Sequence, residues 1–158
     1  MIKLLRTDSD NLDFIELVRR LDIDLAKRDG DDHSFYAQFN KIATLKHVVV
    51  AFDNEQPVGC GAIKQFDKEA MEVKRMYTSP TSRNKGIASK VLSELEKWTA
   101  ELGYKKCVLE TGIKQPEAIG LYLKNGYKLI PNYGQYAEVE DSRCFEKQLN
   151  ILSHHTSI

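Results

Sequence analysis

The chain has few of the features that mark membrane-bound, secreted or metal-binding proteins. Its 158 residues contain no apolar run of membrane-spanning length, and the opening segment Met1–Asp8 has no signal-peptide core. Cysteine is scarce: Cys60, Cys107 and Cys144 lie far apart in strand-like segments, and their spacing matches no metal site. These absences predict a cytoplasmic protein with reduced, partly buried thiols, without a bound metal and without a membrane partner.

The chain also lacks an excess of charge of either sign. Lys and Arg number 23, Asp and Glu number 23, and the formal net charge is zero. Broad binding to nucleic acid or to an anionic membrane needs a basic excess, so we expect neither partner, although one local basic pocket stays possible. There are no repeats and no linker. Length then predicts a single domain over residues 1–150, followed by a frayed tail at 151–158.

Apolar periodicity and turn residues predict an alternation of strands and helices. Helices are expected from a cap at Asp10 to Arg28, at His33–Asn40, from Ile87 to a stop at Gly103, and from Pro116 to Gly126. Strands are expected at Ile2–Arg6, Val48–Asp53, Val58–Phe66, Met71–Thr78, Lys106–Thr111, Tyr127–Ile130 and Arg143–Leu149. This βααβββαβαββ order predicts an α+β fold, a three-layer αβα domain with a mixed, mostly antiparallel central sheet.

Two helices show an apolar stripe. In the first helix the stripe is expected to contain Leu12, Ile15, Val18 or Arg19, and Ile23. The third helix is expected to be amphipathic. Its apolar residues recur at spacings of four, four, three and four, which places on one face Ile87, Val91, Leu95, Trp98 and Leu102.

The most informative segment joins the strand Met71–Thr78 to the third helix. The breaker Ser79-Pro80 ends the strand, and the basic turn Arg83–Ala88 leads directly into the helix. Strand, turn and helix N-terminus together present backbone N–H groups and the positive end of a helix dipole to an anion. Arg83 and Lys85 add two cations, unless they are ordinary solvated turn charges, and Gly86 lets a phosphate approach the backbone. This segment predicts a phosphate-binding elbow.

The elbow resembles the pyrophosphate loop of the GNAT N-acetyltransferase superfamily. Arg83-x-x-Gly86-x-Ala88, after a strand that ends Arg75-Met76-Tyr77-Thr78, is similar to that family's Arg/Gln-x-x-Gly-x-Gly/Ala pattern. Downstream, Leu109-Glu110-Thr111 and the segment Ala118–Tyr127 resemble the family's fifth strand and fourth helix. The motif-bearing resemblance covers about half of the chain, from Ala70 to Ile130.

The resemblance implies acetyl-CoA as co-substrate and an amine as acceptor. In such proteins main-chain groups of the strand pair with the pantetheine arm, here at Met76, Tyr77 and Thr78. Gln115 stands where the family often has an asparagine that touches the pantetheine region, and the small Thr111-Gly112 replaces Val-Arg. The residues expected around the diphosphate are Arg83, Asn84, Lys85, Gly86, Ile87, Ala88 and Ser89.

The same resemblance implies two catalytic residues. Glu72 lies eleven residues before Arg83, where some relatives place a general base. It is expected on one strand face with Lys74 and Met76, and its alternative role is an ion pair with Lys74. Glu110 is a second base candidate that fits a structural glutamate, and a base can also act through water. Tyr122 matches the tyrosine that protonates the leaving thiolate, although it could instead be a packed aromatic like Tyr127.

The acceptor is less well defined. The aromatic and polar segment Pro131–Tyr136, with the acidic segment Asp29–Asp32, could line a pocket for a cationic amine, although an acidic loop is more often a solvated turn. No role is expected for His33, His47 or the pair His154-His155.

The sequence therefore predicts an acetyl-CoA-dependent N-acetyltransferase that moves an acetyl group to a primary amine of a small molecule, protein or peptide. Attack in a ternary complex is expected, since no cysteine sits in an elbow suited to an acyl-enzyme. The alternative is a non-catalytic acyl-CoA-binding or sensing module of the same fold. A nucleotide-binding regulatory domain is disfavoured because no Walker Lys-Ser/Thr pair follows Gly86. Association into a homodimer stays open.

Overall fold

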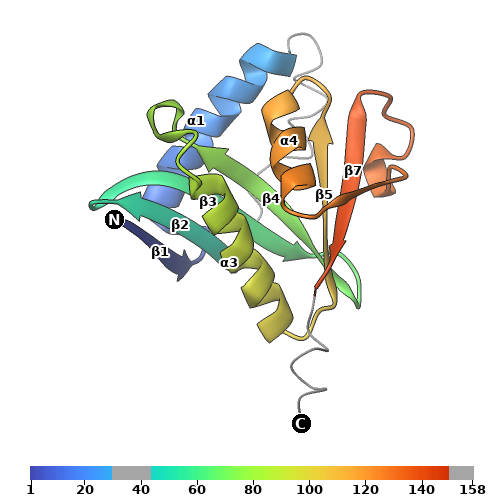
Figure 1. Ribbon diagram of the computed structural model, residues 1–158, viewed down its shortest axis with the longest axis horizontal. Coiled ribbons are helices and arrows are strands. Elements are labelled where there is room, and N and C mark those ends of the chain that lie inside the picture. Colours follow the sequence, from blue (N-terminus) through green and yellow to red (C-terminus); the bar gives the residue numbers. More distant parts are fainter. Residues whose placement is uncertain (30–43, 150–158) are drawn as a thin grey trace. The chain divides into compact units, whose positions relative to one another are not determined.

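The computed structural model describes residues 1–29 and 44–149 (Figure 1). The second predicted helix, His33–Asn40, and the tail at 151–158 lie outside the described residues. The helices are α1 (Leu12–Asp29), α3 (Ile87–Glu101) and α4 (Pro116–Lys124), with 3₁₀ turns η2 (Pro80–Ser82) and η3 (Gly134–Tyr136). The strands are β1 (Ile2–Thr7), β2 (His47–Asp53), β3 (Gln56–Gln65), β4 (Ala70–Thr78), β5 (Lys106–Gly112), β6 (Lys128–Ile130) and β7 (Ser142–Gln148).

These strands belong to one sheet with the order β1-β2-β3-β4-β5-β7-β6. The pairs β1–β2, β2–β3, β5–β7 and β6–β7 are antiparallel. β4 and β5 run parallel, in register from Ala70 with Lys106 to Glu72 with Val108, and α3 forms the connection between them. The predicted α+β fold with a mixed, mostly antiparallel sheet is confirmed.

The chain divides into two compact units. The first comprises Met1–Lys64 and Lys74–Leu95, and the second comprises Gln65–Val73 and Glu96–Ile158. Strand β4 and helix α3 each contribute residues to both units. The single domain expected over residues 1–150 stays a prediction.

In the first unit, the buried stripe of α1 differs from the predicted one at three positions. Leu12, Ile15 and Ile23 remain 80%, 41% and 46% accessible, whereas Val18 is buried, as one of the predicted alternatives had it. The N-terminal cap is also one residue later than predicted, because the Asn11 side chain, not that of Asp10, accepts the N–H of Phe14 at 2.9 Å. Five α1 residues enter the core: Phe14, Leu17, Val18, Leu21 and Leu25. They pack with the strand residues Val48, Val50, Cys60, Ala62 and Tyr77.

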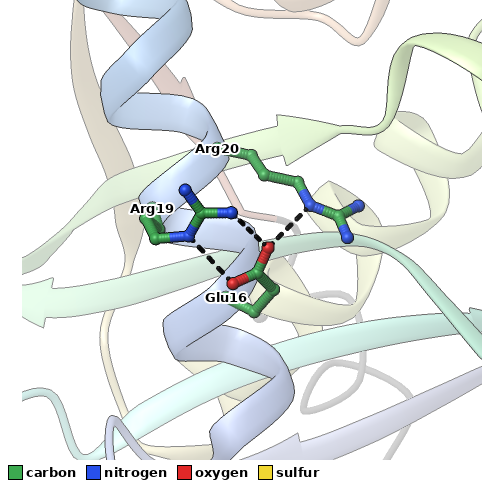
Figure 2. A network of polar contacts seen from close by, with 3 residues as sticks. All are labelled: Glu16, Arg19 and Arg20. Carbon is green, nitrogen blue, oxygen red and sulfur yellow. Dashed lines mark hydrogen bonds and ion pairs between the residues drawn. The ribbon is translucent and has the colours of Figure 1, made fainter.

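The outer surface of α1 carries a cluster of charged side chains. Figure 2 shows the Glu16 carboxylate between the guanidinium groups of Arg19 and Arg20, at 2.9 and 3.0 Å. Hydrogen bonds from Arg19 and then Arg20 lower the pKa of Glu16 to about 2. These contacts follow the i, i+3 and i, i+4 spacing of an exposed helix face, so they support the helix and do not form a candidate site.

Helix α3 covers the opposite face of the first unit's strands. Cys60 and Ala62 of β3 pack with α1, whereas Gly61, which alternates with them, points toward α3. Three predicted core positions of α3 are confirmed, since Ile87, Val91 and Leu95 are buried. Leu102 was placed in that face wrongly: α3 ends at Glu101, and 41% of Leu102 is exposed.

The second unit is held together by a charged network. Lys147 on β7 approaches Glu96 of α3 at 2.9 Å, and the hydroxyl of Tyr127 donates to the other Glu96 oxygen at 2.9 Å. Tyr127 is buried, which agrees with its predicted packing role. Because both oxygens accept a hydrogen bond, the partly buried Glu96 carboxylate is well compensated.

The three cysteines are free and fully buried. Burial raises the pKa of the Cys60 thiol to about 12, and those of Cys107 and Cys144 to about 11. The thiols are thus unpaired, and they are more deeply buried than the partly buried thiols predicted. None of the helices in the two described ranges is long and apolar enough to span a bilayer.

Candidate functional site

The turn between β4 and α3 is built from two residues in the left-handed region. The Ser79 N–H donates to Val58 O at 2.8 Å where the chain leaves the strand. Asn84 then has φ 66° and Gly86 has φ 78°. Asparagine tolerates this region and glycine enters it without a Cβ penalty, so the local sequence explains the turn. The predicted strand, turn and helix geometry is present.

The first turn of α3 offers backbone donors beside this turn. The Lys90 N–H makes the first i→i−4 bond, to Gly86 O at 3.1 Å, so the amides of Ile87 and Ala88 precede the helical ladder and have no acceptor within it. Asn84, Lys85 and Gly86 are exposed next to these amides. The arrangement favours an anionic ligand, because the dipole and the N–H groups act in the same direction.

Arg83 is partly engaged by its own turn. Its Nε donates to Thr78 O at 3.0 Å, and its guanidinium carbon lies 6.0 Å from the Tyr77 ring centroid. This hydrogen bond stabilises the turn. It also occupies the Thr78 carbonyl, which is one of the main-chain groups expected to pair with the pantetheine arm. Sequence reasoning did not foresee this bracing role.

Strand β4 is irregular just before the elbow. Arg75 has φ 60°, which interrupts the regular alternation assumed for Glu72, Lys74 and Met76. Beyond it, Met76 lies against Gly61 on the α3 side, while Tyr77 is buried in the core with α1. The two side chains that follow the interruption therefore serve packing, as expected where the main chain is the recognising group.

Two hydroxyl groups at the elbow are buried and unsatisfied. Within the described ranges, Oγ1 of Thr78 and Oγ of Ser79 have no hydrogen-bond partner. Buried polar groups normally find a partner, so these two hydroxyls are exceptions at the end of β4. The exposed turn and the α3 amides, in contrast, are accessible to an anionic group such as a phosphate.

Glu72 is buried on β4 in the second unit and accepts a short hydrogen bond. The Tyr133 hydroxyl donates to Glu72 Oε2 at 2.7 Å, and 9% of Glu72 remains accessible. Tyr133 belongs to the aromatic loop Pro131–Tyr136, but nothing in the sequence singled out its contact with Glu72. Of the acidic segment Asp29–Asp32, residues after Asp29 lie outside the described part of the chain.

Glu110 on β5 has a clear structural contact. It accepts a hydrogen bond from Ser142 Oγ at 2.7 Å and lies opposite Cys144 of the neighbouring strand β7. The pKa values of Tyr136 and Cys144 are raised, chiefly by burial and to a smaller extent by the negative charges of Glu110 and Glu72. Both carboxylates therefore lie near Tyr136 and Cys144. The hydrogen bond from Ser142 to Glu110 is the kind of contact expected of a structural glutamate.

Tyr122 on α4 is a buried, packed tyrosine. Its ring lies 5.7 Å from that of Tyr127 and 6.3 Å from that of Phe145, centroid to centroid. Burial, followed by the Glu110 charge, raises its pKa, so the hydroxyl keeps its proton at neutral pH. No hydrogen bond to this hydroxyl is present within residues 1–29 and 44–149.

Gln115 lies at the turn from β5 into α4. Its N–H donates to Gly112 O at 3.1 Å, and it precedes Pro116 without a side-chain cap bond. His47 is half-buried at the start of β2, and burial and Lys46 lower its pKa. The described residues contain no group of three or more side chains suited to a metal ion.

A family comparison decides the classification. The acetyltransferase (GNAT) family matches residues 13–127, which is most of the chain. The chain belongs to the GNAT acetyltransferase family. GNAT relatives include YsnE of Bacillus subtilis, an uncharacterized N-acetyltransferase that is 32% identical over 101 residues, 63% of this chain and 67% of that protein. An IAA acetyltransferase of Azospirillum brasilense is 38% identical over 94 residues, 58% of this chain and 61% of that protein. The matches thus span about two thirds or less of these relatives.

Solved GNAT structures share the fold across nearly the whole chain. An acyl-CoA N-acyltransferase structure from Klebsiella pneumoniae is 28% identical with a TM-score of 0.78, covering 94% of this chain and 98% of that chain. A GNAT acetyltransferase from Elizabethkingia anophelis, solved with acetyl-CoA bound, is 19% identical with a TM-score of 0.67, covering 94% and 98%. The family match thus assigns this chain to the acyltransferases of the GNAT class.

Proposed function

We propose that the protein transfers the acetyl group of acetyl-CoA to a primary amine of a small molecule, protein or peptide, by direct attack in a ternary complex. The observation that carries the proposal is the elbow, where left-handed Asn84 and Gly86 precede the amides of α3. The acetyl-CoA bound by a structural relative of the same fold supports the choice of donor.

The elbow would hold the diphosphate of coenzyme A. The amides from Asn84 to Ser89, with Lys85 as a nearby cation, would donate to phosphate oxygens. Main-chain groups of Met76 and Tyr77, with Gln115, are proposed for the pantetheine arm.

Glu72 is the proposed general base and Tyr122 the proposed general acid. Glu72 would accept a proton from the acceptor ammonium, directly or through water, so that the amine nitrogen can attack the thioester carbonyl. As the carbon–sulfur bond breaks, the departing thiolate would take the proton of the Tyr122 hydroxyl. The raised pKa of Tyr122 keeps that proton in place before the reaction.

Calorimetry with acetyl-CoA tests the elbow. Gly86→Glu would place a carboxylate at the N-terminus of α3, where it competes with the diphosphate, and we expect acetyl-CoA affinity to be lost while the fold is kept. Gly103→Glu is a matched control, because Gly103 also has a positive φ, of 94°, and a Cβ added there would meet no described atom within 4 Å. Unchanged affinity in Gly86→Glu would overturn the proposal.

A panel of primary amines, with thiol release as the readout, tests transfer itself. Release that depends on both acetyl-CoA and an amine supports the enzyme. Tight acetyl-CoA binding without turnover across the panel would instead support the alternative, a non-catalytic acyl-CoA-binding or sensing module.

A further inference from the structure

The hydrogen bond between Tyr133 and Glu72 joins a loop to a strand 61 residues away in the chain. At 2.7 Å the bond has the length of a charge-assisted O–H···O⁻ contact. The Tyr133 ring is held from two sides, with centroids 4.7 Å from Phe66 and 6.1 Å from Tyr136, both in edge contacts. The hydroxyl is therefore presented to Glu72 by a fixed ring.

The backbone beside Tyr133 is also anchored. The Asn132 side chain donates from Nδ2 to Val139 O and to Ser142 O, each at 3.0 Å, which closes the loop on itself. The Tyr136 N–H donates to Tyr133 O at 2.9 Å at the start of η3. A loop tied at these points can fix a side-chain contact to within the tolerance that proton transfer needs.

Other charged and titratable groups lie close to Glu72 and Tyr133. Glu110 on β5 and Cys144 on β7 share the surroundings of Glu72, and Lys74 lies two residues further along β4. The pKa of Tyr133 is raised chiefly by burial, then by the charge of Glu72 and by the hydrogen bond between the two residues. The Tyr133 hydroxyl therefore keeps its proton and acts as the donor in this contact, with Glu72 Oε2 as the acceptor.

We propose that Tyr133 is a positioning residue that keeps Glu72 ionised and oriented for deprotonation of the acceptor amine. This inference rests on the proposed function, because it acts through Glu72 as base. A hydrogen bond to the charged form favours that form over the neutral acid, so the base is ready at lower pH with Tyr133 than without it.

Tyr133→Phe removes the donor and keeps the ring contacts. We expect kcat to fall about tenfold, KM for acetyl-CoA to stay unchanged, and the rising limb of kcat against pH to move up by about one pH unit. Tyr104→Phe, in the turn after α3, is the matched control and should leave all three unchanged. A Tyr133→Phe profile that overlays the wild-type profile would overturn the proposal.

A second measurement does not need turnover. Carbon-13 NMR of the glutamate side chains follows protonation of the Glu72 carboxyl directly, with Glu72→Gln used to assign its signal. We expect its titration midpoint to be higher in Tyr133→Phe than in the wild type, and equal midpoints would refute the coupling. If the midpoint moves but no amine is acetylated, the contact is upheld, whereas the proposed reaction, and with it the role of Tyr133 in catalysis, fails.

Discussion

Leu95 of α3 lies so close to Gly61 of β3 that a side chain at position 61 would clash with it. A Cβ added to Gly61 would lie 2.9 Å from Leu95 Cδ1 and 3.0 Å from Val91 Cγ1, and 2.5 Å from Sδ of Met76 on β4. Gly59 lies at a second close approach, 3.0 Å from Ile87 Cγ2 by the same measure. The two glycines of β3, which have no side chain, thus allow α3 to pack directly against the strand backbone.

Gly61→Ala is expected to lower the free energy of unfolding by about 1 to 3 kcal/mol, because the added methyl overpacks the contact with α3. Denaturant unfolding measures the change. Gly120→Ala is the control: Gly120 lies within α4 and its Cβ would meet no described atom within 4 Å, so this variant should be stabilised by about 0.5 to 1 kcal/mol. Equal effects of the two variants would contradict the close approach.

Tyr122→Phe should lower turnover by about tenfold to a thousandfold, the range of lost general-acid assistance. Acetyl-CoA affinity by calorimetry should change little, since only the hydroxyl is removed and the ring contacts with Tyr127 and Phe145 remain. Full turnover in the variant would show that Tyr122 is a packing residue and that the thiolate leaves without an acid.

Glu72→Gln is best judged by its pH profile. The amide keeps the size and hydrogen-bonding capacity of the carboxylate but cannot take up a proton, so turnover should be most impaired near neutral pH. At high pH, where the acceptor is already a free amine, the rate should recover toward wild type. Uniform loss across pH would indicate a positioning role instead.

Glu110→Gln distinguishes the roles of Glu110 and Glu72. Because Glu110 accepts a hydrogen bond from Ser142 Oγ, the variant should lose about 1 to 3 kcal/mol in the free energy of unfolding, with the shape of the pH–rate profile unchanged. If instead Glu110→Gln shows the pH-dependent defect and Glu72→Gln does not, the assignment of the base moves to Glu110.

The ion pair of Arg75 with Asp22 predicts unequal losses of stability for two substitutions. The guanidinium is 3% exposed, and its Nη2 contacts Asp22 at 3.0 Å, while Nε and Nη1 have no partner in the described chain. Asp22→Ala would leave this buried charge uncompensated and should cost about 1 to 3 kcal/mol in unfolding free energy. Arg75→Met removes the charge with a side chain of similar length and should cost less, as thermal unfolding of both variants can show.

Most of the strands could be predicted because their signals are local. The turn between β2 and β3 is an example: Asn54 and Glu55 have φ 49° and 75°, as a two-residue hairpin turn requires. The apolar stripe of α1 could not be fixed in this way. Leu12, Ile15 and Ile23 have helical spacing, but so do Phe14, Leu17 and Leu21, and packing against the sheet selects the second set.

The elbow and the proposed base, Glu72, likewise differ in how local their sequence signals are. The elbow is contiguous, so its glycine, its cations and its helix start can be read from the sequence between Ser79 and Ala88. The contact of Tyr133 with Glu72 spans 61 residues, and no periodicity or motif encodes it. The bracing of Arg83 by Thr78 O was also missed, since a turn arginine is more often solvated.

The buried cysteines have a practical consequence for kinetic work. An aromatic disulfide dye reacts with thiolates, and thiols whose pKa values are about 11 or 12 are almost entirely protonated at assay pH. Cys60, Cys107 and Cys144 should therefore stay silent toward the dye in the folded protein, while liberated coenzyme A is free to react. Colour development would report each acetylation event continuously, and a slow late rise in absorbance would signal unfolding rather than catalysis.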